Sequence, residues 1–136
     1  MSNDAVLYDV KDAVATITLN RPKALNALNM ELTEGLVATV DKAASDPNAR
    51  CVVLTSSSEH FMAGGDLMMF KTWLNEGVEV AQEKLLDVFD AVHSTVKKIK
   101  TMDKLIRHSG GSQSMQPRRY AALAEPREAV LDTLVA

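Results

Sequence analysis

The chain has 136 residues, of which 46% are hydrophobic and 24% are charged, and its formal net charge is −3. These values are typical of a single globular domain with a buried core, and they argue against nucleic-acid binding, which usually needs a basic face. Its one cysteine, Cys51, excludes an internal disulfide, and neither a signal peptide nor a membrane-spanning run is recognisable, so we expect a cytoplasmic protein with no membrane partner.

Two short strands are predicted at the start of the chain. Residues 6–11 and the β-branched run at 14–20 are separated by Asp12-Ala13, which indicates a tight turn between antiparallel strands. Asn20-Arg21-Pro22 ends the second strand, because proline lacks the N–H group that a ladder needs.

A helix and a buried strand follow. The helix is expected over 30–44, with Asn29 as its N-cap and Asp46-Pro47-Asn48 ending it. Residues 51–56 form a continuous apolar run, as expected for a strand covered on both faces. The order strand, helix, strand predicts a right-handed crossover with parallel pairing of 14–20 and 51–56. A buried structural thiol at Cys51 is favoured over a reactive one.

The most informative segment follows that strand and reads His60-Phe61-Met62-Ala63-Gly64-Gly65-Asp66. We call residues 63–66 the glycine turn. A strand, a glycine turn and a helix start leave backbone N–H groups directed at an anion. Adjacent glycines permit positive φ angles and close approach of a ligand, and Asp66 can cap the next helix. The alternative is an ordinary left-handed turn that Asp66 caps.

Two helices are expected after the glycine turn, a short one over 66–75 and a long one over 78–100. The long helix has apolar residues at helical spacing over five turns, which predicts one buried face formed by Ala81, Leu85, Val88, Phe89, Val92, Val96 and Ile99.

The composition changes near Lys104. Residues 1–104 contain nine lysines and two arginines, whereas 105–136 contain four arginines and no lysine. We therefore divide the chain into a domain over 1–104 and an atypical tail over 105–136. The tail is interpreted as loop or disorder over 105–127 with a short terminal helix, or alternatively as a polar linker to a docking helix.

Two motifs together resemble the crotonase superfamily, the enoyl-CoA hydratase/isomerase family. One motif covers residues 17–28 and reads ITLNRPKALNAL, and the other covers residues 61–67 and reads FMAGGDL. Each alone also fits a plain turn, but both occur in the right order with a βαβ spacing between them. The resemblance covers about Val6 to Lys104. It implies an α/β fold, namely a partial spiral of ββα turns followed by an irregular C-terminal tail.

The resemblance also implies a ligand. Family members bind acyl-CoA thioesters, with coenzyme A as part of the substrate and neither a separate cofactor nor a metal, and they usually assemble as trimers or hexamers. Lys23, Ala24 and Leu25 would contact the nucleotide and pantetheine arm of coenzyme A. The alternative for Lys23 is a solvated surface charge.

In the family, backbone N–H groups form an oxyanion hole that stabilises an enolate anion. The glycine turn would surround the thioester, so that Ala63 and Asp66 contact the acyl-CoA. The first oxyanion donor would be the amide of Ala63, Gly64 or Gly65, and the residue types do not decide among these three. Fixed amide dipoles stabilise a thioester oxygen that becomes negative in the transition state.

The residues after Lys104 depart from the family pattern. That pattern needs an apolar strand, a glycine-rich turn that supplies the second oxyanion amide, and catalytic carboxylates, usually two glutamates. Here Leu105-Ile106 is expected to be too short for a strand, and no carboxylate lies between Asp103 and Glu125. A changed reading frame near codon 104 is one hypothesis, which the coding DNA would test.

These departures leave three classes of function open. The first is an enoyl-CoA hydratase/isomerase-type enzyme that is incomplete and impaired, and the second is a non-catalytic acyl-CoA-binding or interaction remnant. The third and weakest is a purely structural α/β domain.

Overall fold

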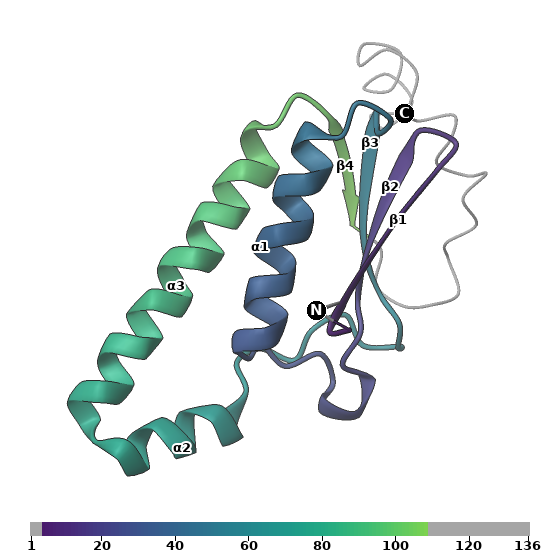
Figure 1. The fold of residues 1–136 in the computed structure, drawn as a ribbon. Helices are drawn as coiled ribbons and strands as arrows, with labels where there is room; N and C mark the ends of the chain where they lie inside the picture. Colours follow the sequence, from purple (N-terminus) through teal and green to yellow (C-terminus); the bar gives the residue numbers. More distant parts are fainter. Residues whose placement is uncertain (1–3, 109–136) are drawn as a thin grey trace, which may run out of the picture.

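The computed structural model describes residues 4–108, in which four strands form one sheet, one long helix lies against a face of that sheet, and a second long helix packs on the first (Figure 1). The α/β class is confirmed. In chain order the elements are β1 (Val6–Lys11), β2 (Val14–Leu19), the 3-10 turn η1 (Pro22–Ala24), α1 (Met30–Ser45), β3 (Cys51–Ser56), α2 (Leu67–Glu76), α3 (Val78–Thr101) and β4 (Leu105–His108).

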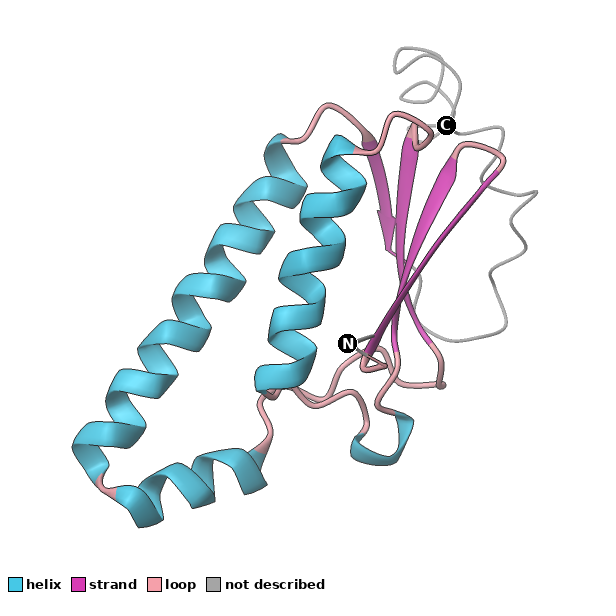
Figure 2. Cartoon of the chain, in the orientation of Figure 1, coloured by secondary structure: helices cyan, strands magenta, loops and turns pink. Residues whose placement is uncertain are grey.

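The strand order β1-β2-β3-β4 follows the sequence. β1 and β2 pair antiparallel through a turn in which Asp12 and Ala13 have φ angles of 52° and 64°, the left-handed values of a tight hairpin. β2 and β3 pair parallel, with Ile17 opposite Leu54, which confirms the predicted crossover. Because β2, β3 and β4 are parallel, their carboxyl ends lie at one edge of the sheet (Figure 2).

The interpretation of the first residues after Lys104 as a loop is wrong. Leu105–His108 form β4, which pairs parallel with residues 51–54 of β3. Ile106 packs against the main core, and Leu105 packs against Val14, Cys51 and Val53 on the other face of the sheet. Two apolar residues carry no readable periodicity, so the partner strand and not the local sequence decides this conformation. The expected terminal helix over 128–135 lies outside the described residues.

The main core lies between the sheet and α1. Asn29 caps α1 as predicted, since its side-chain oxygen accepts a hydrogen bond of 2.9 Å from the amide of Leu32. The helix buries one face against β1 and β2, and this core contains Ala15, Ile17, Leu19, Leu32, Leu36, Val40 and Ala43. Cys51 is fully buried, and burial raises the pKa of its thiol to about 11, which fits the predicted structural role.

α3 packs against α1 through a narrower face than the sequence indicated. Val88 and Thr95 are buried, whereas Phe89 and Val96 keep 47% and 43% of their surface exposed. Each exposed residue directly follows a buried one, so it lies about 100° further round the helix. The prediction that Phe89 and Val96 share the buried face is therefore wrong.

Lys104 closes the carboxyl end of α1. Its ammonium group donates hydrogen bonds of 2.6 Å to the carbonyls of both Ala43 and Asp46, in the last turn of the helix. Hydrogen bonds that involve a charged group contribute about 1.5–3 kcal/mol, and a cation is favourable at this end of a helix dipole.

We expect Lys104→Met to lower the free energy of unfolding by about 1.5–3 kcal/mol in urea titrations, because these hydrogen bonds are lost. Lys97→Met, at an exposed position of α3, is the control and should leave the midpoint unchanged. Equal midpoints for both variants would contradict the cap.

Candidate functional site

The two motif segments meet at the carboxyl ends of β2 and β3, near the lower edge of the sheet in Figure 1. The first segment leaves β2 and turns through η1, and the second leaves β3 and forms the glycine turn before α2. In open parallel sheets this edge is where ligands usually bind, because loops from neighbouring strands converge there.

Backbone hydrogen bonds join the two segments directly. The amide of Ala63 donates to the carbonyl of Leu25 at 3.1 Å, the amide of Leu28 donates to Gly64 at 2.7 Å, and the amide of Asp66 donates to Leu28 at 2.9 Å. Leu28 and Gly65 form a parallel β-bridge. The candidate coenzyme A residues and the candidate thioester residues are therefore parts of one structural unit.

Asn26, which the sequence did not single out, connects the two segments through side-chain hydrogen bonds. Its side chain is fully buried and its φ angle is 54°, a left-handed value that asparagine tolerates better than most residues. The side-chain oxygen accepts a 2.7 Å bond from the amide of Arg21, and the side-chain nitrogen donates to Ser56 Oγ at 2.6 Å and to the carbonyl of His60 at 3.2 Å. An asparagine four residues after a proline was the available signal, but its partners are 30 and 34 residues away in the chain.

Asp66 caps α2, as predicted, and also forms an ion pair. Its Oδ1 accepts hydrogen bonds from the amides of Met68 and Met69 at 3.0 and 3.3 Å, and its Oδ2 lies 3.1 Å from Arg21 Nη2. Burial alone would raise the pKa of this carboxyl. The hydrogen bonds from Met69, Arg21 and Met68 outweigh that effect and hold the pKa below its usual value of 3.8.

This lowered pKa predicts an acid-sensitive fold. A carboxyl whose pKa is lower in the folded state contributes stability that is present above the unfolded value of 3.8 and is lost as the pH falls through the folded value. We expect urea midpoints to fall as the pH is lowered below about 4. Asp66→Asn should be less stable near neutral pH and should lose less on acidification. An identical pH dependence in the two proteins would contradict the assignment. Because the pKa of Asp46 is also lowered, part of the acid loss should persist in the variant.

The two glycines of the turn have different structural roles. Gly64 has a φ angle of 103°, which side chains rarely adopt, so the expected positive φ is confirmed at this position. Gly65 does not share that conformation, and the expectation of positive φ is wrong there. At Gly65 a Cβ atom would lie 2.6 Å from Cε2 of Phe70, so any larger residue would force the ring or the turn to shift.

The three candidate oxyanion amides also differ. The amide of Ala63 donates to Leu25, whereas the structure gives the amides of Gly64 and Gly65 no acceptor among residues 4–108. All three residues are exposed to solvent or nearly so, and they precede the first turn of α2, whose N-terminus carries partial positive charge. The turn can therefore present N–H groups to an anionic oxygen.

The predicted coenzyme A residues lie in and just after the 3-10 turn η1. Lys23 is exposed and Leu25 keeps 48% of its surface exposed with a left-handed φ angle of 52°. An open hollow of about 370 Å³ is lined by residues 20–24. The structure thus places Lys23 and Ala24 at a solvent-accessible surface that a large ligand can reach.

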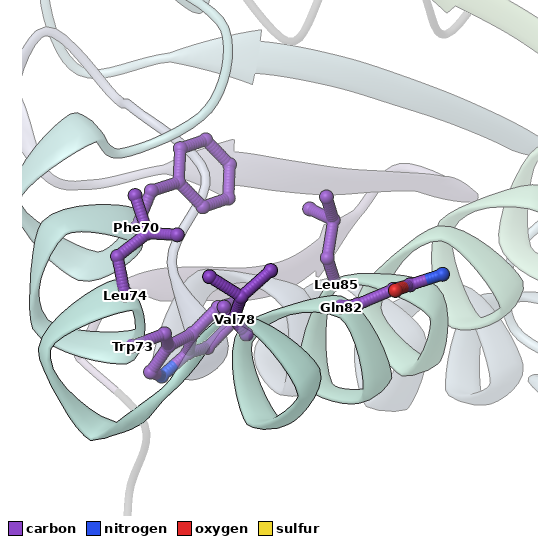
Figure 3. A pocket seen from close by; sticks show the side chains of 7 residues that line it. Phe70, Trp73, Leu74, Val78, Gln82 and Leu85 are labelled. Atoms are coloured by element: carbon purple, nitrogen blue, oxygen red, sulfur yellow. The ribbon is translucent and has the colours of Figure 1, made fainter.

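A second, apolar hollow of about 250 Å³ lies between α2 and α3, and the sequence did not predict it. Figure 3 shows its side chains arranged around one space. The lining residues are Phe70, Trp73, Leu74, Val78, Ala81, Gln82 and Leu85. Phe70 also lies over Gly65, so the hollow begins beside the glycine turn.

Within residues 4–108, no group of three or more histidine, cysteine, aspartate or glutamate side chains is placed to hold a metal ion. None of the helices in that same range combines the length and the apolar character that crossing a membrane would take.

Comparison with known proteins gives consistent matches. A family model described as enoyl-CoA hydratase/isomerase matches residues 9–102. The probable enoyl-CoA hydratase EchA14 of Mycobacterium tuberculosis is 36% identical over 91 residues, which cover 67% of this chain and 36% of that protein. The small ribosomal subunit protein mS47 of Schizosaccharomyces pombe is 32% identical over 76 residues, which cover 56% of this chain and 18% of that protein.

The fold is also similar to solved structures. The crystal structure of an enoyl-CoA hydratase from Mycobacterium marinum matches with a TM-score of 0.61 at 26% identity, over 78% of this chain and 47% of that chain. The chain spans between 18% and 36% of the length of these curated relatives.

Proposed function

The chain belongs to the enoyl-CoA hydratase/isomerase (crotonase) family, and we propose that its described residues form the acyl-CoA-binding part of such a site. The observation that carries this proposal is the direct joining of the two motif segments. Bonds from Leu25 and Leu28 to the glycine turn fix the distance between a surface that can hold a nucleotide and amides that can hold a carbonyl oxygen. One extended thioester ligand can therefore engage both.

In this proposal the coenzyme A arm lies along η1. The phosphates of coenzyme A are anionic, and lysine binds phosphate as a point charge. Lys23 is the exposed cation of this turn, while Ala24 and Leu25 supply contacts for the pantetheine arm. The open hollow beside residues 20–24 leaves room for such a ligand.

The thioester carbonyl then lies at the glycine turn. The amides of Gly64 and Gly65 have no acceptor within the described residues, and the amide of Ala63 becomes available if its bond to Leu25 lengthens. A donor directed at the developing oxyanion contributes about 3–4 kcal/mol to transition-state stabilisation. The glycine turn is thus proposed to supply the first half of an oxyanion hole for an enolate.

The acyl chain would continue past Phe70 into the apolar hollow between α2 and α3. Phe70 borders both the glycine turn and the hollow, so the two lie on either side of its ring. Trp73 meets Phe70 edge to face, with ring centroids 6.0 Å apart, and forms one wall. Apolar lining of this kind suits a hydrocarbon chain, because burial of each CH₂ group is favourable by about 0.8 kcal/mol.

A calorimetric titration of the full chain with crotonyl-CoA tests this proposal, with coenzyme A as the comparison ligand. Binding should stabilise the fold, by about 2.7 kcal/mol at a ligand concentration of 100 times Kd. Crotonyl-CoA should bind more tightly than coenzyme A, because only the thioester reaches the glycine turn. No heat and no rise in melting temperature with either ligand would refute acyl-CoA binding.

A second candidate is a non-catalytic acyl-CoA-binding or interaction protein. Asp66, the carboxylate in the glycine turn, is occupied at both oxygens by Arg21 and by the start of α2. A similar protein, mS47, is named as a ribosomal subunit protein. The two candidates are separated by following the absorbance of an enoyl-CoA double bond, since only the enzyme consumes it. Binding without turnover would favour the second.

A further inference from the structure

Arg21 lies between the two halves of the candidate site. It follows β2, whereas its ion-pair partner Asp66 follows β3, 45 residues later in the chain. The guanidinium group makes two contacts: Nη2 donates to Asp66 Oδ2 at 3.1 Å, and Nη1 donates to the carbonyl of Ala27. The two side chains of the pair keep 20% and 16% of their surface exposed, so the contact is largely shielded from water.

The ion pair holds the side chain of Asp66, which is the N-cap of α2. Asp66 Oδ1 accepts from the amides of Met68 and Met69, which leaves Oδ2 for Arg21. The backbone of Asp66 is also bonded to Leu28, which directly follows the Ala27 carbonyl that Arg21 holds. Arg21 therefore ties the last residue of the glycine turn to the segment that pairs with it.

Two other ion pairs of the described residues are more exposed than this one. Lys84–Glu76 and Lys98–Asp41 have side chains that are between 41% and 53% exposed. Exposed pairs of this kind contribute little, because water and salt screen them. The arginine fork can also serve two acceptors in a fixed geometry, which a lysine ammonium cannot reproduce.

We propose that Arg21 is a positioning residue of the thioester site: it holds Gly64 and Gly65 at a fixed distance from the 23–25 turn. The inference rests on the proposed function, because it assumes one ligand that spans both turns. When two subsites bind one ligand, the second contact benefits from the first only if their spacing fits. Removing the two Arg21 side-chain contacts should then weaken binding of the thioester more than binding of the nucleotide.

The test compares Arg21→Met with the wild-type chain by calorimetric titration of coenzyme A and of crotonyl-CoA. Arg21 also lines the hollow beside residues 20–24, so the affinity for coenzyme A should fall by up to about threefold. The affinity for crotonyl-CoA should fall by a further factor of about ten or more, which corresponds to one broken charge-assisted contact. Arg21→Lys should be intermediate. The matched control is Lys98→Met, which breaks an ion pair between α1 and α3 away from both turns and should change neither affinity. Equal losses for both ligands in Arg21→Met would overturn the positioning role.

A ligand-free measurement separates this inference from the proposed function. The amides of Leu28 and Asp66 are hydrogen-bonded across the two segments, so their hydrogen exchange reports whether the turn is held. In Arg21→Met they should exchange at least about tenfold faster, while amides between β2 and β3 keep their wild-type rates. A wild-type chain that binds neither ligand would refute the proposed function. Unchanged exchange of Leu28 and Asp66 in a folded Arg21→Met protein would overturn the role of Arg21.

Discussion

A protein that consists of these 136 residues is expected to hydrate an enoyl-CoA at least about 10⁴-fold more slowly than a full-length relative. We expect no second oxyanion amide from the sequence after Lys104, and its loss would account for about 10²–10³ in rate. We likewise expect no positioned acid/base carboxylates, and their loss would account for a further factor of about 10²–10⁴. Among the described residues the glycine turn offers only Asp66 as a carboxylate of its own, and hydrogen bonds occupy both of its oxygens.

The measurement is the loss of enoyl-CoA absorbance over time, with a full-length relative such as EchA14 assayed beside it. The same preparation must bind crotonyl-CoA, so that slow turnover is not confused with an unfolded sample. A turnover rate typical of the relative would contradict the prediction. In that case the tail carboxylates Glu125, Glu128 and Asp132 are the next candidates, and their replacement by amides should abolish the rate.

Elements with strong local signals could be predicted from the sequence. The β-branched run at 14–20 and the apolar run at 51–56 became parallel strands, and Asn29 and Asp66 became caps. Each of these depends on residue types within a few positions, such as a side-chain oxygen and the amides two or three residues later. Periodicity and capping therefore sufficed for the elements that place the glycine turn.

Features that depend on distant partners could not be predicted. β4 exists because residues 51–54 of β3 offer a free edge to Leu105–His108. The roles of Asn26 and Arg21 depend on partners that are 30 and 45 residues away in the chain. No local sequence pattern indicates such distant contacts. The requirement for glycine at position 65 comes from the ring of Phe70 and not from its own backbone angles.

The position of β4 also shifts the point where this chain departs from its family. The strand that the family pattern places after the long helix is present at Leu105–His108. The part of the chain that fits the expected pattern of elements therefore extends to His108, four residues beyond the composition change at Lys104. A search of the coding DNA for a changed frame should start there, and a frame that restores no glycine-rich turn would refute that hypothesis.

Replacement of Gly65 is expected to have the largest effect on ligand binding. In Gly65→Val the new Cβ would lie 2.6 and 2.7 Å from two ring carbons of Phe70, so either the ring or the turn must move. Overpacking of this kind costs about 1–3 kcal/mol. If the ring moves, it enters the hollow that it now lines; if the turn moves, the bridge to Leu28 weakens. Both outcomes remove part of the proposed thioester site.

We therefore expect Gly65→Val to weaken crotonyl-CoA binding by about tenfold to 100-fold, since 1.4 kcal/mol corresponds to roughly a factor of ten. Calorimetric titration measures this loss, and a urea titration shows whether the variant is folded. The double variant Gly65→Val/Phe70→Ala removes the clashing ring and should recover part of the affinity, even though Phe70 itself borders the hollow. If folded Gly65→Val binds crotonyl-CoA as tightly as the wild-type chain, the glycine turn is not the thioester site, because a ligand held there could not avoid the displaced ring or backbone.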